Sequence, residues 1–271
     1  MEVISILELL LTGILAGFAA GFMGVGGGAV LTPLCILVFP ALGVRTDNLV
    51  KIIFGTNMFL ITVFSISAVL KHHGNSKIDW RTVWIMGPLA ILGSLTGAWL
   101  ASMASPGVLK KAFAVLLIVS SLVIVIKGST KPGGDVKNRK AIIPIKFLPL
   151  LGFVAGVAGS FLGIGGGVVM IPALILLFAL PIDRVAGTSS SVIIFIGIAG
   201  MLAYMWYGAG DVELPGWSTG YVWWSAAIPL AIGGVPMARA GAWVNSRLHA
   251  RLLHKIFGLI LLILAVKMLF F

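Results

Sequence analysis

The stretch GFAAGFMGVGGGAVLTP, residues 17–33, interrupts an otherwise apolar run, and six of its 17 residues are glycine. Glycine is a weak helix former, but it allows positive φ angles and the close approach of another group. Pro33 lacks a backbone donor and disfavours helix at the residue before it. A helix broken in this way leaves unpaired N–H groups, which a membrane tolerates only inside protein or beside a cavity. The stretch therefore predicts a buried break between two helical segments.

The composition indicates that this break lies in a membrane protein. Of the 271 residues, 59% are hydrophobic and 10% are charged, whereas soluble domains carry about 25% charged residues. Apolar runs approaching the roughly 20 residues that cross a bilayer core of about 30 Å recur along the chain. The single cysteine, Cys35, excludes an internal disulfide and a cysteine-based metal cluster. We predict an all-α polytopic membrane protein that carries no cofactor.

The glycine motif occurs twice. GFMGVGGGAVLTP at 21–33 matches SFLGIGGGVVMIP at 160–172, a shift of 139 residues (172 − 33). Further along, Gly55-Thr56-Asn57 matches Gly187-Thr188-Ser189. The chain therefore reads as a duplication, with a first membrane repeat at 1–127, a basic cytoplasmic linker at 128–145 and a second membrane repeat at 146–271.

Each repeat holds about five hydrophobic segments, which gives eight to ten membrane segments in all. The first two segments of each half form a helical pair broken by glycine and proline, and the sequence leaves open whether that pair spans or re-enters the membrane. Lysine and arginine favour the cytoplasmic side, which places the linker inside. Because each repeat has an odd number of segments, the two repeats have opposite orientations in the membrane. Inverted repeats are typical of secondary transporters, and short, broken segments at matching positions in the two halves indicate the binding site.

The residues at these breaks are suited to holding an anion. N–H groups at a helix N-terminus carry partial positive charge and bind anions, although close helix packing is the alternative role for membrane glycines. Hydroxyl and amide side chains follow in the third segment of each half, where helix capping and bonds to the helix's own carbonyls are the alternative. The candidate substrate-binding residues are Gly26, Gly27, Gly28, Thr56, Asn57, Gly165, Gly166, Gly167, Thr188, Ser189 and Ser190.

Arg239 completes this candidate set, because an arginine inside a membrane segment is costly and by default functional. Snorkelling of its guanidinium to the interface is the alternative. Basic cytoplasmic loops explain the net charge of +11, with an anion-attracting surface as the alternative, and we expect no nucleic-acid partner. The sequence contains no HExxH, Walker or dinucleotide fingerprint in its required context, and we expect no enzymatic activity.

The duplicated GVGGGAVLTP and GIGGGVVMIP, with RVAGTSSS at 184–191, resemble the TauE/SafE family of sulfite and sulfonate exporters. The resemblance covers essentially the whole chain and implies a multi-pass permease of the bacterial inner membrane. It implies export of small sulfur-containing anions such as sulfite, thiosulfate or organosulfonates. We expect alternating access at a midplane site between the repeats. An anion channel, a permease for another small organic solute and a non-transporting scaffold remain alternatives, and the oligomeric state, a homodimer included, is left open.

Overall fold

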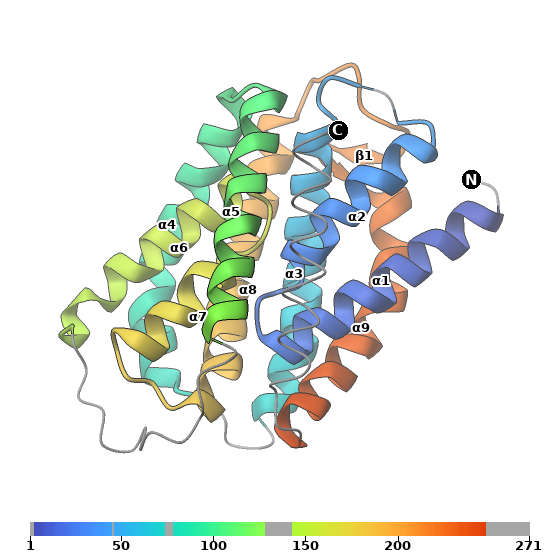
Figure 1. Ribbon diagram of the computed structural model, residues 1–271. Coiled ribbons are helices and arrows are strands. Elements are labelled where there is room, and N and C mark those ends of the chain that lie inside the picture. Colours follow the sequence, from blue (N-terminus) through green and yellow to red (C-terminus); the bar gives the residue numbers. More distant parts are fainter. Residues whose placement is uncertain (1–2, 45, 74–77, 128–142, 248–271) are drawn as a thin grey trace.

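The computed structural model describes residues 3–44, 46–73, 78–127 and 143–247 (Figure 1). Most of the predicted linker (128–142) lies outside these residues, and so do residues 248–271, which include the last hydrophobic segment predicted for the second repeat (252–271). Within the described part the chain forms nine α-helices, one 3-10 helix and a two-stranded hairpin. They are α1 (Val3–Met23), α2 (Gly28–Ala41), α3 (Leu49–His73), α4 (Trp80–Met103), α5 (Pro106–Lys127), η2 (Ile145–Phe147), α6 (Leu148–Phe161), α7 (Gly167–Leu176), α8 (Ile182–Tyr207), β1 (Ser218–Thr219), β2 (Val222–Trp223) and α9 (Trp224–Arg247).

Five of the described helices, α1, α3, α4, α8 and α9, are long and apolar enough to cross a membrane, which confirms the predicted helical membrane fold. The departure from it is the antiparallel hairpin of β1 and β2, which pairs Ser218 with Trp223 just before α9. In the apolar stretch long enough to cross a membrane, 78% of the residues of α3 and 72% of those of α8 are buried, against 39–50% for α1, α4 and α9. The helices α3 and α8 therefore form the centre, and α1 and α9 flank it on one side while α4 and α6 flank it on the other (Figure 1).

Small residues bring the outer helices into contact. A methyl group on Gly13 would overlap the backbone of Leu230, and one on Gly21 would overlap that of Ala238, so α1 and α9 run parallel with their backbones touching. The pair α6 and α4 packs in the same way, with Gly156 against the backbone of Ala90. Close approach through small residues is how membrane helices gain packing energy without a hydrophobic driving force.

The break predicted at the first glycine motif is present, and it is formed by glycine rather than by proline. Between α1 and α2, Gly24, Gly26 and Gly27 adopt φ angles of 67°, 81° and 80°, a region that residues with a Cβ avoid. Pro33, expected to contribute to the break, lies inside α2. Its fixed φ is compatible with helix, and it removes only one hydrogen bond of the helix interior.

The second motif forms the same turn between α6 and α7, with φ of 65°, 79° and 77° at Gly163, Gly165 and Gly166. Its proline, Pro172, likewise lies inside the following helix. The helices that follow the turns, α2 and α7, have 14 and 10 residues, or about 21 and 15 Å at 1.5 Å per residue. Neither can cross a core of about 30 Å by itself, so each turn is a buried reversal within the molecule.

Candidate functional site

The two glycine turns meet beside the middle of α3 and α8. A methyl group placed on Gly26 would lie 2.8 Å from Ile61 Cγ2 and 3.1 Å from Ile193 Cγ2, and one placed on Gly165 would have the same two distances. Both isoleucines are fully buried, Ile61 halfway along α3 and Ile193 near the middle of α8. One turn from each half of the chain therefore packs on the same pair of side chains, and we call this point the crossing.

The starts of α2 and α7 face each other at the crossing. Gly28 packs against the backbone of Ile164, and a methyl group on Gly167 would lie 2.6 Å from Val25 Cα. The first amides of a helix have no partner within that helix. Among the backbone hydrogen bonds of the described residues, the amides of Gly28 and Gly167 donate to no carbonyl. Two helix N-termini, each with partial positive charge, thus converge at one buried place.

Asn57 is tied to the second turn through a residue that the sequence analysis did not single out. Its Nδ2 donates to Thr32 Oγ1 at 2.8 Å, and Thr32 Oγ1 lies 3.4 Å from the carbonyl oxygen of Gly163, to which it donates. The Cys35 thiol lies 3.9 Å from Asn57 Oδ1. All of these side chains are buried, so Asn57, Thr32 and Cys35 form a polar cluster between α3 and α2.

Ser189 holds the first turn in a corresponding way. Its hydroxyl is 2.8 Å from the carbonyl oxygen of Gly24 and 3.1 Å from that of Ala186, one turn earlier in α8. Asn57 and Ser189, which align in the repeat, therefore each support the glycine turn of the half to which they do not belong.

Thr56 and Thr188 make matching contacts away from the crossing. Thr56 Oγ1 accepts the backbone N–H of Trp223 at 3.0 Å, immediately before α9. Thr188 Oγ1 accepts the N–H of Asp79 at 2.9 Å, immediately before α4. Each threonine thereby anchors the segment that enters a long helix of the other half of the chain, a structural role that the sequence pattern did not reveal.

Two buried hydroxyls are left without a partner. Ser190 Oγ and Ser65 Oγ accept or donate no hydrogen bond within the described residues, and both residues are 1% exposed. Ser190 precedes Ile193 by three positions on α8, and Ser65 follows Ile61 by four on α3. Residues three or four apart share a helix face, so each serine lies one turn from the crossing on the face that packs there. Ser65 gave no sequence signal, because it is a lone serine in an apolar segment.

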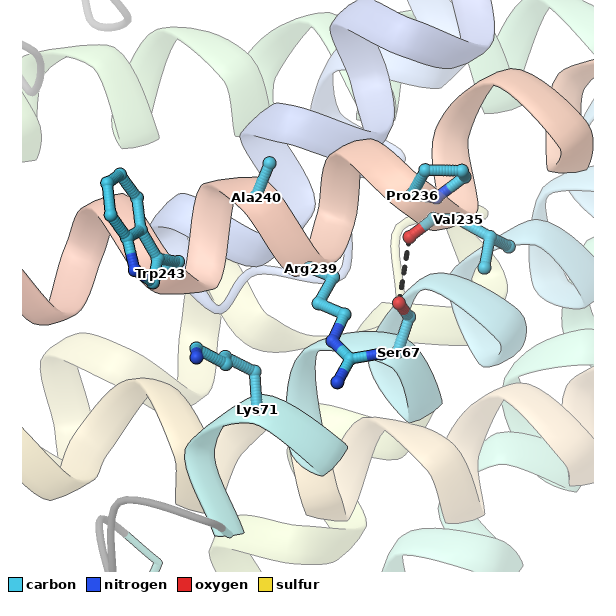
Figure 2. Close-up of a pocket in the computed structure, with 7 residues that line it drawn as sticks. All are labelled: Ser67, Lys71, Val235, Pro236, Arg239, Ala240 and Trp243. Atoms are coloured by element: carbon cyan, nitrogen blue, oxygen red, sulfur yellow. Dashed lines mark hydrogen bonds between the residues drawn. The ribbon is translucent and has the colours of Figure 1, made fainter.

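Arg239 is not brought to the crossing. It is exposed on α9 and lines an open pocket of about 580 Å³, together with Ser67, Lys71, Val235, Pro236, Ala240 and Trp243 (Figure 2). None of these residues belongs to a glycine turn. The structure therefore gathers Gly26–Gly28, Asn57, Gly165–Gly167, Ser189 and Ser190 around one point and separates Arg239 from them.

The polar groups around the crossing are neutral. In the described part of the chain, Glu8, Asp47, Asp79, Asp183, Asp211 and Glu213 lie near helix ends or in connections, apart from Glu8 in the second turn of α1. Nor do the described residues include a group of three or more His, Cys, Asp or Glu that could hold a metal ion. The described site can offer hydrogen bonds and helix-dipole charge to a solute.

Comparison with known proteins gives a full-length family match. The sequence model described as "Sulfite exporter TauE/SafE" matches residues 9–268. A "probable membrane transporter protein" of Haemophilus influenzae is 29% identical over 97% of this chain and 97% of its own length. A similarly described protein of the archaeon Methanocaldococcus jannaschii is 24% identical over 96% of this chain and 94% of its own. No solved structure matches.

The family is one of transporters rather than enzymes, and the relatives are described as probable transporters, which agrees with the expectation from the sequence. The match runs through both glycine motifs and nearly the whole length of the chain. The chain is a multi-pass membrane transporter that belongs to the sulfite exporter TauE/SafE family.

Proposed function

We propose that this protein exports a small sulfur-containing anion, such as sulfite, thiosulfate or an organosulfonate, across the bacterial inner membrane. The substrate class follows the description of the family. The observation that carries the proposal is the convergence of the N-termini of α2 and α7 beside Ile61 and Ile193, because helix N-termini stabilise anions in a dry environment.

Neutral side chains around the crossing would complete the binding site. Ser190 and Ser65 supply hydroxyls that no described protein group uses, and a hydrogen bond to a charged group contributes about 1.5–3 kcal/mol. Asn57 and Ser189 keep the turns in place through Thr32 and the Gly24 carbonyl. Donors without full charge would hold an oxyanion and still release it.

The halves 1–127 and 146–271 would be inverted repeats that alternate access. Matching contacts support this: α1 packs on α9 as α6 packs on α4, and Thr56 and Thr188 anchor corresponding segments. The described conformation is closed at the crossing, where Ile61 and Ile193 are fully buried. Rocking of one repeat against the other would separate the glycine turns from Ile61 and Ile193 and open the crossing to one side of the membrane at a time.

A thermal-shift screen of the purified protein tests this proposal with sulfite, thiosulfate, sulfoacetate, taurine, sulfate and chloride. A ligand at 100 times its Kd stabilises a protein by about 2.7 kcal/mol, so a sulfur oxyanion should raise the Tm selectively. Ser190→Ala should reduce that shift, whereas Ser191→Ala, whose hydroxyl bonds to Gly187 O within its own helix, should retain it. A folded protein that responds to none of these anions contradicts the proposed substrate class.

Flux in proteoliposomes separates a transporter from an anion channel. The proposal expects saturable uptake that is accelerated by the same anion on the opposite side, because one site is exposed to each side in turn. Conductance without such counterflow would favour the channel and overturn alternating access.

A further inference from the structure

The pocket that contains Arg239 is built by the last two turns of α3 and the second half of α9. Ser67 and Lys71 lie one turn apart on α3, and Arg239 and Trp243 lie one turn apart on α9. The Ser67 hydroxyl donates to the carbonyl of Val235 at 2.8 Å and joins the two helices at the pocket. Figure 2 shows both basic side chains between α3 and α9, with the Lys71 amine on the side of Trp243 and the Arg239 guanidinium beside Ser67.

Two cations therefore line one pocket. No hydrogen bond or ion pair among the described residues engages Lys71 Nζ or the Arg239 guanidinium. Like charges held close together are unfavourable unless an anion lies between them. Arginine and lysine donors also match the oxygens of phosphate, so the chemistry of the pocket is that of an oxyanion site.

The surroundings of Arg239 indicate where that oxyanion comes from. Ile228, Ile232, Pro236, Arg239 and Trp243 follow one another at intervals of three or four on α9, and all five are exposed. Apart from Arg239, this stripe is apolar, which is typical of a face turned toward lipid. Tryptophan favours the membrane interface, and α3 ends two residues after Lys71, on the side that the basic loops predict to be cytoplasmic.

We propose that Lys71 and Arg239 bind the phosphate of an anionic phospholipid from the cytoplasmic leaflet. The lipid headgroup occupies the pocket while its acyl chains lie along the stripe of Ile228 and Ile232. Basic pockets between membrane helices on the cytoplasmic side are suited to such headgroups. This lipid site is separate from the crossing and does not depend on which solute is transported.

The test uses the full chain, purified in an uncharged detergent, and measures binding of phosphatidylglycerol and phosphatidylcholine by native mass spectrometry and thermal shift. Each cation near a membrane surface contributes about a fivefold gain in affinity for anionic lipid. Lys71→Gln and Arg239→Gln should each weaken phosphatidylglycerol binding about fivefold, and the double variant about 30-fold. Arg184→Gln, which removes an exposed cation at the start of α8, is the matched control and should bind as the parent does.

The outcomes separate the lipid from a soluble anion. The proposal expects a preference for phosphatidylglycerol over phosphatidylcholine that the double variant loses while keeping its Tm in phosphatidylcholine. Equal binding of the two lipids by the parent overturns the proposal, and so does undiminished phosphatidylglycerol binding by the double variant. A Tm rise with inorganic phosphate that the double variant loses, without a phosphatidylglycerol preference, assigns the pocket to a soluble oxyanion and also overturns it. Should the double variant fail to fold, Arg239→Lys, which keeps the charge, must retain binding where Arg239→Gln does not.

Discussion

The two glycine turns have nearly the same backbone but different support. Each places three glycines at positive φ, Gly24, Gly26 and Gly27 in one and the corresponding glycines in the other. In the second turn, the amides of Ile164 and Gly165 both donate to the carbonyl of Gly159. Within the described residues, the matching amides of the first turn donate to no backbone carbonyl.

The side chains that hold the turns differ as well. Ser189 reaches the Gly24 carbonyl directly at 2.8 Å, whereas Asn57 acts on Gly163 through Thr32, whose bond to that carbonyl is 3.4 Å long. Thr32 has no hydroxyl counterpart in the second half, where Ile171 stands. The two turns therefore need glycine at corresponding positions but differ in their hydrogen-bond partners, and within the described residues the first turn has more backbone N–H groups available to a ligand.

Alanine at Gly26 or Gly165 should have the largest effect. The left-handed backbone costs a residue with a Cβ about 1–2 kcal/mol, and the added methyl would also press on Ile61 Cγ2 at 2.8 Å. Thermal unfolding should show a larger loss of Tm than for Gly43→Ala, where φ is +86° but nothing lies within 4 Å. Gly107→Ala, with neither constraint, should be neutral. A loss at Gly26 no greater than at Gly43 would mean that the crossing is loosely packed.

Asn57→Ala should be the next most damaging, and more so than Ser189→Ala. It removes the donor to Thr32 and the contact with Cys35, and an unsatisfied buried polar group costs about 1–3 kcal/mol. Ser189→Ala removes one hydroxyl already shared between two carbonyls. Chemical denaturation of both variants measures the difference. Equal losses would show that the two turns are supported alike.

Valine at Thr56 or Thr188 tests the contacts that the halves have in common. Each change keeps the shape of the side chain but leaves the N–H of Trp223 or Asp79 without its acceptor, at a cost of about 1–3 kcal/mol. The two losses of stability should be similar, serine should restore most of each, and the substrate KM in proteoliposomes should stay unchanged. A raised KM with normal stability would instead assign the threonine to the substrate.

Ser190→Ala should have the smallest effect on stability. Its hydroxyl has no partner among the described residues, so removing it sacrifices no hydrogen bond there. The Kd for the transported anion should nevertheless rise tenfold or more, since a hydrogen bond to a charged group contributes about 1.5–3 kcal/mol. Isothermal titration of this variant against the parent measures the change. An unaltered Kd would remove Ser190 from the site.

The sequence by itself determined the membrane class, the helical fold and the position of both buried breaks. A continuous hydrophobic segment of spanning length satisfies its own backbone hydrogen bonds in lipid by forming a helix. Three glycines within four residues allow a turn that few other residues adopt. The repeated motif also indicated that the two breaks are equivalent, and Asn57 and Ser189 were identified from their matched places after those breaks.

Only the tertiary structure decided which of these residues meet. Local pattern did not distinguish Thr56 and Thr188, which anchor loops, from Ser190, which is unpartnered beside the crossing. Thr32, Ile61 and Ser65 were missed, because a single residue in an apolar helix carries no sign of its partners across the fold. Arg239 was grouped with the glycines, whereas α9 turns it outward beside Lys71. The physical reason is that periodicity fixes the face of a helix, while contacts between distant helices fix what that face meets.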